Sequence, residues 1–222
     1  MTVKGVLVSA EGKIDSAFED QPLVEAAVRH TMGVVYCRLG EYKDAKRHLL
    51  RAMELRTRLL GPERPRTLHS MNNLAIVSAG QARFLTTCAD LKLRDPEGAL
   101  QLAMDAVKLA TQSSYCWQVL GWAHYRTGAW QASVEALEKS MQLQKDPAGG
   151  DSFQWFFLAM AHWQLGQKEE ARQWYGRAVE WMDKEMPKNE LLRRIRTEAA
   201  TLLGLAEQTT QVGEEVVPGE DQ

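Results

Sequence analysis

The chain has 222 residues, of which 45% are hydrophobic and 25% charged, an ordinary balance for a folded soluble protein. Its 27 Lys and Arg against 29 Asp and Glu give a net charge of -2, which offers no global reason to expect nucleic acid or an anionic membrane as partner. The apolar stretches are shorter than the roughly 20 residues of a membrane span, and residues 1–13 lack the apolar core of a secretory signal.

The cysteines are three, an odd number, and they are widely spaced at Cys37, Cys88 and Cys116. This argues against a disulfide framework and a Cys-based zinc site, and it is typical of a reducing compartment. We therefore expect a cytoplasmic protein that needs no cofactor and no metal.

Residues 1–20 are predicted to be an N-terminal extension with a short helix around residues 9–19. Asp20 and Gln21 followed by Pro22 are typical of a helix start, and we expect a helical repeat domain over residues 21–204. Apolar residues recur there every three to four positions, which favours helices over strands.

One pattern recurs along this domain. "WQVLGWAHYRTGAW" (Trp117–Trp130) and "WFFLAMAHWQLGQK" (Trp155–Lys168) are two copies of it, and two more stretches fit. Each copy has a small residue where two antiparallel helices would cross, at Gly33, Ala75, Gly121 and Ala159. Three copies also have a second small residue downstream, at Ala45, Ser133 and Ala171, and a glycine where the first helix would end, at Gly40, Gly128 and Gly166. The pattern predicts pairs of packed helices.

The second copy is irregular, because no second helix follows "MNNLAIVSAGQ" directly. Either two half-units are fused or residues 68–87 form one long first helix. We favour the long helix, since Gly80 is its only weak breaker. Farther on, Asp151 and Gln154 form a capping-box pattern, residues 189–204 are predicted to be an amphipathic capping helix, and residues 205–222 a disordered acidic tail.

The repeats resemble those of tetratricopeptide repeat (TPR) proteins, over roughly residues 22–204. "GPERPRTLHSMNNLA" is similar to the TPR type of kinesin light chains, with Arg64 in place of their usual His. The second part looks like the C-terminal TPR regions of bacterial serine/threonine kinases, but the sequence has no kinase motif, so no kinase activity is expected. The resemblance implies an all-α fold, a right-handed superhelical solenoid of antiparallel helix pairs.

The resemblance also implies a concave groove lined by the first helices of the units. At the groove-facing positions stand mostly aromatic side chains, and Trp, Tyr and Arg dominate binding hot spots. An alternative stays open, in which the C-terminal helix or tight packing covers this stripe. The predicted peptide-binding residues are Tyr115, Gln118, Trp122, Tyr125, Arg126, Phe156, Met160 and Trp163.

Asn72 and Asn73 complete the predicted site. In kinesin-light-chain-like repeats the first of these positions commonly bonds a peptide backbone, and an amide both donates and accepts. The family's clamp for chaperone tails requires Lys and Asn where His30 and Val34 stand, so we do not expect chaperone-tail binding.

No constellation of catalytic residues can be assembled from the sequence, so we expect no enzyme. His124 and His162 occupy the same repeat position, without a carboxylate or Cys at metal-ligand spacing. They are predicted to pack between helices with a buried hydrogen bond. The basic segment 43–66 fits a solvated helix face better than RNA contact.

The functional hypothesis is a non-catalytic protein–protein interaction module. It would bind a peptide or a partner protein in the groove, as the scaffolding part of a bacterial signalling assembly. A self-associating structural scaffold, and with it a homo-oligomer, stays open. An RNA-binding helical repeat is a minor alternative, because neither nucleic acid nor a membrane is an expected partner.

Overall fold

The computed structural model describes residues 2–144 and 150–205 of the chain. Within these ranges the chain forms ten α-helices, one short 3-10 helix and no strand, which confirms the all-α expectation. The elements are α1 (Val3–Ala17), α2 (Pro22–Arg38), α3 (Tyr42–Leu60), α4 (Pro65–Thr87), η1 (Leu91–Leu93), α5 (Pro96–Leu109), α6 (Ser114–Arg126), α7 (Trp130–Leu143), α8 (Ser152–Gln164), α9 (Lys168–Glu185) and α10 (Glu190–Leu203).

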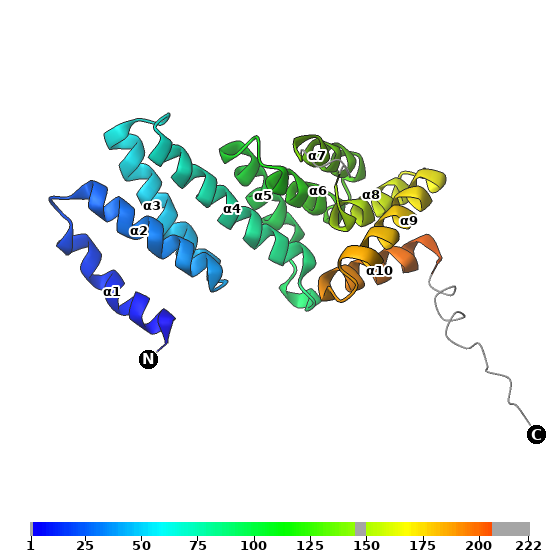
Figure 1. The fold of residues 1–222 in the computed structure, drawn as a ribbon, viewed down its shortest axis with the longest axis horizontal. Helices are drawn as coiled ribbons and strands as arrows, with labels where there is room; N and C mark the ends of the chain where they lie inside the picture. Colours follow the sequence, from blue (N-terminus) through cyan, green and yellow to red (C-terminus); the bar gives the residue numbers. More distant parts are fainter. Residues whose placement is uncertain (1, 145–149, 206–222) are drawn as a thin grey trace, which may run out of the picture.

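Four helical hairpins form the body of the molecule, namely α2 with α3, α4 with α5, α6 with α7 and α8 with α9. Consecutive hairpins pack side by side, and the first helix α6 also contacts the first helices α4 and α8 of its neighbours. Figure 1 shows them following one another along the long axis, with α1 beside the first hairpin and α10 beneath the last. The fold is a TPR-like solenoid. No helix in the described ranges combines the length and apolarity needed to cross a bilayer.

The small residues lie at the helix crossings, as predicted. A Cβ atom on Gly33 would lie 2.6 Å from Cγ of Leu49, and one on Gly121 would lie 2.5 Å from Cγ of Leu137. These distances are far below van der Waals contact, so the backbones approach closely only because the side chain is missing. The glycines that end the first helices have φ angles of 77°, 80° and 82°, at Gly40, Gly128 and Gly166.

The irregular second unit is one long helix, α4, followed by α5 as its partner, so the prediction of a long helix over residues 68–87 is confirmed. Gly80 does not break α4. It is buried, and a Cβ there would lie 3.1 Å from Cε1 of Tyr42. The glycine therefore admits a tyrosine ring of the preceding hairpin.

Helix α1 extends over more residues than the predicted short helix, and Glu11 attaches it to the first hairpin. The hydroxyl of Tyr36 donates to Glu11 Oε1 at 2.6 Å, Nε2 of His48 lies 2.9 Å from the same oxygen, and Arg47 donates to Oε2 at 2.8 Å. Burial alone would raise the pKa of Glu11, but these hydrogen bonds outweigh it and lower the pKa to about 2. Burial and the Glu11 contact raise the pKa of Tyr36 to about 12.

Glu11→Gln should destabilise the protein at pH 7 by about 1–3 kcal/mol, because hydrogen bonds to a charged acceptor are lost. The folded pKa of Glu11 lies below its ordinary value of 4.5, so the wild-type advantage is complete above pH 4.5 and is lost as the pH falls towards 2. Urea unfolding of both proteins across this range measures it. Glu19→Gln, at an exposed position, is the control. A Glu11→Gln effect that did not shrink on acidification would contradict the role of the carboxylate.

The last hairpin is followed by α10, which covers the residues predicted as a capping helix over 189–204. The Asn189 side chain accepts from the backbone N–H of Leu192, and Gly204 ends the helix in the left-handed conformation. The capping box predicted at Asp151 and Gln154 opens α8, which confirms it. Apart from Leu205, the predicted acidic tail lies outside the described residues.

Candidate functional site

Part of the aromatic stripe of the last two units lies in the same buried core as α10. Three apolar residues of that helix, Leu192, Ile195 and Ala199, belong to the same buried cluster as Trp122, Phe156 and Met160, and α10 packs against α8. Trp122 also stacks on Phe157, with ring centroids 5.2 Å apart. These side chains of the last two units are therefore packed inside the chain itself.

Four predicted groove residues are buried. Gln118 is 8% exposed, Trp122 is 2%, and Phe156 and Met160 are 0%. These four side chains are closed to solvent in this structure, as the alternative of a stripe covered by the C-terminal helix or by tight packing describes, and their role in peptide binding stays a prediction. An amphipathic helix such as α10 buries its apolar face against other apolar side chains.

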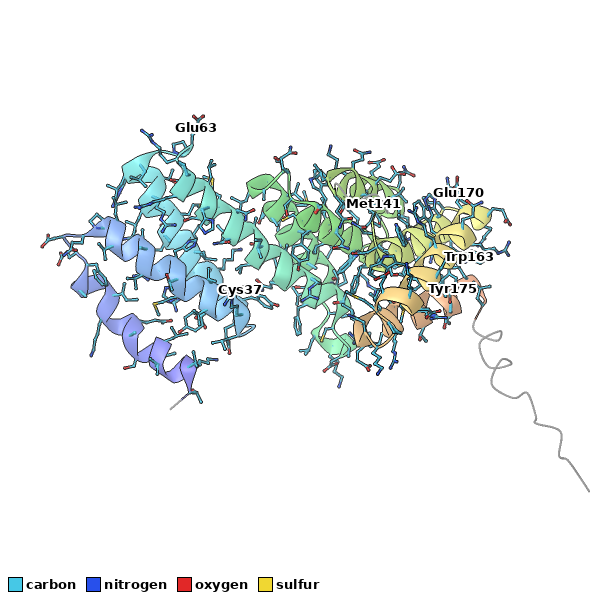
Figure 2. All side chains as sticks on the ribbon, in the orientation of Figure 1. Cys37, Glu63, Met141, Trp163, Glu170 and Tyr175 are labelled. Carbon is cyan, nitrogen blue, oxygen red and sulfur yellow. The ribbon has the colours of Figure 1, made fainter. Side chains whose placement is uncertain are left out.

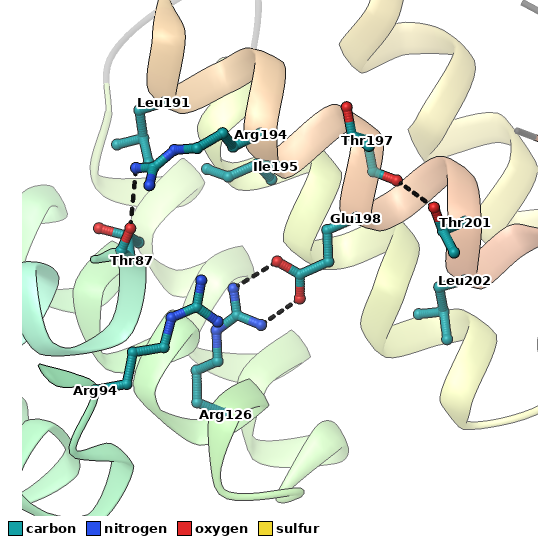
Figure 3. Close-up of a pocket in the computed structure, with 10 residues that line it drawn as sticks. All are labelled: Thr87, Arg94, Arg126, Leu191, Arg194, Ile195, Thr197, Glu198, Thr201 and Leu202. Carbon is teal, nitrogen blue, oxygen red and sulfur yellow. Dashed lines mark hydrogen bonds and ion pairs between the residues drawn. The ribbon is translucent and has the colours of Figure 1, made fainter. Parts of the chain in front are cut away.

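A pocket of about 470 Å³ opens where α10 meets α6 and the end of α4 (Figure 3). Arg126, a predicted site residue, extends from α6 and forms a two-pronged ion pair with Glu198 of α10, with Nη2 2.8 Å from Oε2. Its Nε donates to the carbonyl oxygen of Thr86 at 3.1 Å, so its donors are already engaged within the chain.

Two further arginines donate hydrogen bonds to backbone carbonyl oxygens at the C-terminal end of α4. Arg194 of α10 donates to the carbonyl oxygen of Thr87 at 3.1 Å, and Arg94 donates to that of Cys88 at 2.9 Å. The last carbonyls of a helix have no partners within it and carry negative partial charge. The last turn of α4 contains no basic residue, so other elements supply the cations. Burial, followed by the charge of Arg126, lowers the pKa of Arg94. This cluster joins α4, α6 and α10.

A second pocket, of about 660 Å³, lies between α4 and the turn from α5 to α6, and it brings two predicted site residues together. Asn72 and Tyr115 line it, with Ile76 and the segment Leu109–Ser113. Asn72 is exposed and its amide bonds to no other described residue; Ile76 is 39% exposed and Tyr115 is half-buried. Apolar surface, a free amide and open space occur together here.

The side chain of Asn73 contacts two histidines, one in each of the first two hairpins. Its amide nitrogen lies 3.0 Å from Nε2 of His30 and 3.3 Å from Nε2 of His69, and the two imidazole rings are 4.9 Å apart. Burial, then the charges of Arg56 and His69, lowers the pKa of His30 to about 4. Asn73 is half-buried and bridges α2 and α4, so its amide is not available as that of Asn72 is.

The remaining predicted residues lie at the edges of the covered region. Tyr125 is half-buried, with its ring edge-on to Phe157. Trp163 lies at the end of α8 (Figure 2), where the Nζ atom of Lys168 is 3.4 Å from its ring centroid. Neither Tyr125 nor Trp163 lines the pocket of Asn72.

The two equivalent histidines differ. Nδ1 of His162 lies 2.6 Å from Oε1 of Gln167, whereas the buried Nδ1 of His124 has no hydrogen-bond partner among the described residues. The prediction of a buried hydrogen bond is therefore wrong for His124. Burial lowers the pKa of His124. Within residues 2–144 and 150–205, no three His, Cys, Asp or Glu side chains gather as metal ligands would.

Sequence reasoning missed Ile76 and the turn at residues 109–113 as parts of this pocket. Ile76 lies four residues after Asn72, so both project from the same face of α4. Ile76 directly follows Ala75, as Trp122 follows Gly121 and Met160 follows Ala159, so the same groove-facing repeat position would have identified it.

Models of the tetratricopeptide repeat match the chain at residues 24–85 and 155–182. No curated protein sequence matches it significantly. Among solved structures, a Podosopora anserina putative kinesin light chain with nearly identical TPR-like repeats is 18% identical, with a TM-score of 0.52 over 84% of this chain and 90% of that one.

Two further solved structures have TM-scores of 0.50. BtubC (BKLC) from P. vanneervenii is 15% identical, over 99% of this chain and 80% of that one. MamA AMB-1 is 16% identical, over 83% and 86%. At these identities the structures show the fold alone. Together, the matched segments, the packed helix pairs and these neighbours show that the chain contains tetratricopeptide repeats within a TPR-like solenoid, with kinesin-light-chain-like proteins among those that share its fold.

Proposed function

We propose that the protein is a non-catalytic interaction module that binds an extended segment of a partner protein at the pocket of Asn72, Ile76 and Tyr115. The observation that carries this proposal is the free amide of Asn72 beside half-exposed apolar and aromatic side chains in open space. An amide of this kind can donate to and accept from a peptide backbone, and Ile76 and Tyr115 supply apolar area.

The same fold supports this role in general, because stacked repeats expose long surfaces that serve binding. None of the residues that line the proposed site belongs to α10. The three cysteines are free thiols, and we keep the cytoplasm as the expected compartment on that ground.

A library of random peptides displayed on phage tests the proposal, with enriched peptides resynthesised and titrated by fluorescence anisotropy. Ile76→Glu should weaken binding at least about tenfold, because it places a charge in the apolar contact. Met104→Glu is a matched control, since Met104 on α5 is 40% exposed, close to the 39% of Ile76, and does not line the pocket. If no peptide is enriched, or if both variants bind alike, the proposal fails.

A further inference from the structure

A buried cation on α3 has no acidic partner in the described part of the chain. Arg56 is 8% exposed, and its side-chain contacts are all to neutral groups. Burying a charged group is costly unless an opposite charge or a full set of hydrogen bonds compensates it. Burial and the charge of Arg66 both lower the pKa of Arg56, so the charge of Arg66 adds repulsion.

The hydrogen bonds of Arg56 use only one of its nitrogens. Nη1 donates to Ser70 Oγ at 2.6 Å, to Nδ1 of His30 at 3.2 Å and to the carbonyl oxygen of Arg66 at 3.3 Å. Nε and Nη2 donate to no described residue. These two nitrogens form one edge of the guanidinium, and their parallel N–H groups match two oxygens of one oxyanion.

Arg56 lines a pocket of about 450 Å³ at the junction of α2, α3 and α4. Its two charged lining residues are Arg56 and Arg66, and no acidic residue among those described lines it. The other lining residues are Leu23, Ala27, Leu60, Pro65 and His69. His30, beside the pocket, has a pKa of about 4 and is neutral at pH 7, so it accepts from Arg56 without adding charge.

We propose that this pocket binds a phosphate monoester, with the Nε–Nη2 edge of Arg56 and the guanidinium of Arg66 as its donors. A phosphate monoester carries about −1.5 to −2 charges at pH 7 and three acceptor oxygens, so it offsets both arginines. A carboxylate, with one charge, would leave one cation uncompensated. The apolar residues Leu23, Leu60 and Pro65 then contact the organic part of the ester.

Three small probes test the site by ¹H–¹⁵N NMR at constant ionic strength, namely inorganic phosphate, phenyl phosphate and benzoate. We expect both phosphates to shift the Nε–H signal of Arg56 and the amide signals of residues 66–70 saturably. Phenyl phosphate should bind more tightly than inorganic phosphate, because its ring contacts the apolar wall. If inorganic phosphate binds as tightly as phenyl phosphate, the site takes free phosphate and the monoester assignment is overturned. Benzoate should bind at least about tenfold more weakly than phenyl phosphate, and equal affinities would overturn the phosphate assignment.

Arg66→Gln removes the exposed donor and leaves the buried network of Arg56 in place, so it should fold and weaken phenyl phosphate binding at least about tenfold. Arg56→Lys keeps the charge but loses the two-pronged edge, and a similar loss is expected. Arg58→Gln, an exposed cation of α3 outside the pocket, is the matched control. An absence of saturable shifts, or equal affinities of Arg66→Gln and Arg58→Gln, would overturn the proposal. These titrations use no peptide, so their outcome is independent of binding at Asn72.

Discussion

Gly33→Ala and Gly121→Ala should each lower the free energy of unfolding by about 1–3 kcal/mol, through overpacking at a helix crossing. The new methyl on residue 121 would lie 2.5 Å from Cγ of Leu137 and 3.2 Å from the carbonyl oxygen of Ser133. Leu137 is fully buried, so it has no free space into which to move. At residue 33, Leu49 and the carbonyl oxygen of Ala45 are placed in the same way. Urea unfolding monitored by circular dichroism gives the free energies.

Gly176→Ala is the control for this substitution. Gly176 lies within α9 and a Cβ there would meet nothing within 4 Å, so alanine should stabilise the protein by about 0.5–1 kcal/mol through its higher helix propensity. The opposite signs of the change in the free energy of unfolding distinguish the effect of packing from that of helix propensity. If Gly33→Ala and Gly121→Ala were as stable as the wild type, the hairpins would not depend on close approach at these residues.

The fold was predictable because its determinants are local and repeated. The spacing of Gly33 to Ala45 and of Gly121 to Ser133 places two small residues opposite each other in each hairpin, and each pair needs only its own unit to be recognised. The long helix α4 followed from the absence of a strong breaker. α1 was less predictable, because its attachment depends on Glu11 reaching residues of two other helices.

The candidate site was less predictable, because exposure is set by distant elements. The repeat pattern identified the helix face that carries Trp122 and Phe156, but their burial depends on the packing of several elements, which one repeat does not reveal. Asn72 stands three residues before Ala75, as Gln118 stands three residues before Gly121, and Asn72 is exposed. The Arg56 pocket was not predictable either. The sequence shows the basic residues of segment 43–66, but it does not show that one of them, Arg56, contacts only neutral groups among the described residues.

Arg126→Met should loosen α10 and lower the free energy of unfolding by about 2–3 kcal/mol, because it leaves Glu198 and the end of α4 without their shared donor. The side chain of Arg126 is only 11% exposed, and that of Glu198 is 35%, so water compensates the carboxylate only in part. Hydrogen exchange should accelerate in residues 190–203 more than in α2 or α3. Arg196→Met is the control, since Arg196 pairs with Asp183 at 2.6 Å where the carboxylate is 55% exposed, and a pair of this kind contributes about 0–1 kcal/mol.

The same variant tests whether α10 is what closes the aromatic stripe. If α10 detaches, the faces of Trp122, Phe156 and Met160 become accessible, and the fluorescence of a dye that binds apolar surface should rise while helical content changes little. Arg196→Met should show no such rise. Equal exchange rates in both variants would mean that Leu192 and Ile195 hold α10 in place by packing alone, and that the ion pair of Arg126 and Glu198 adds little to its attachment.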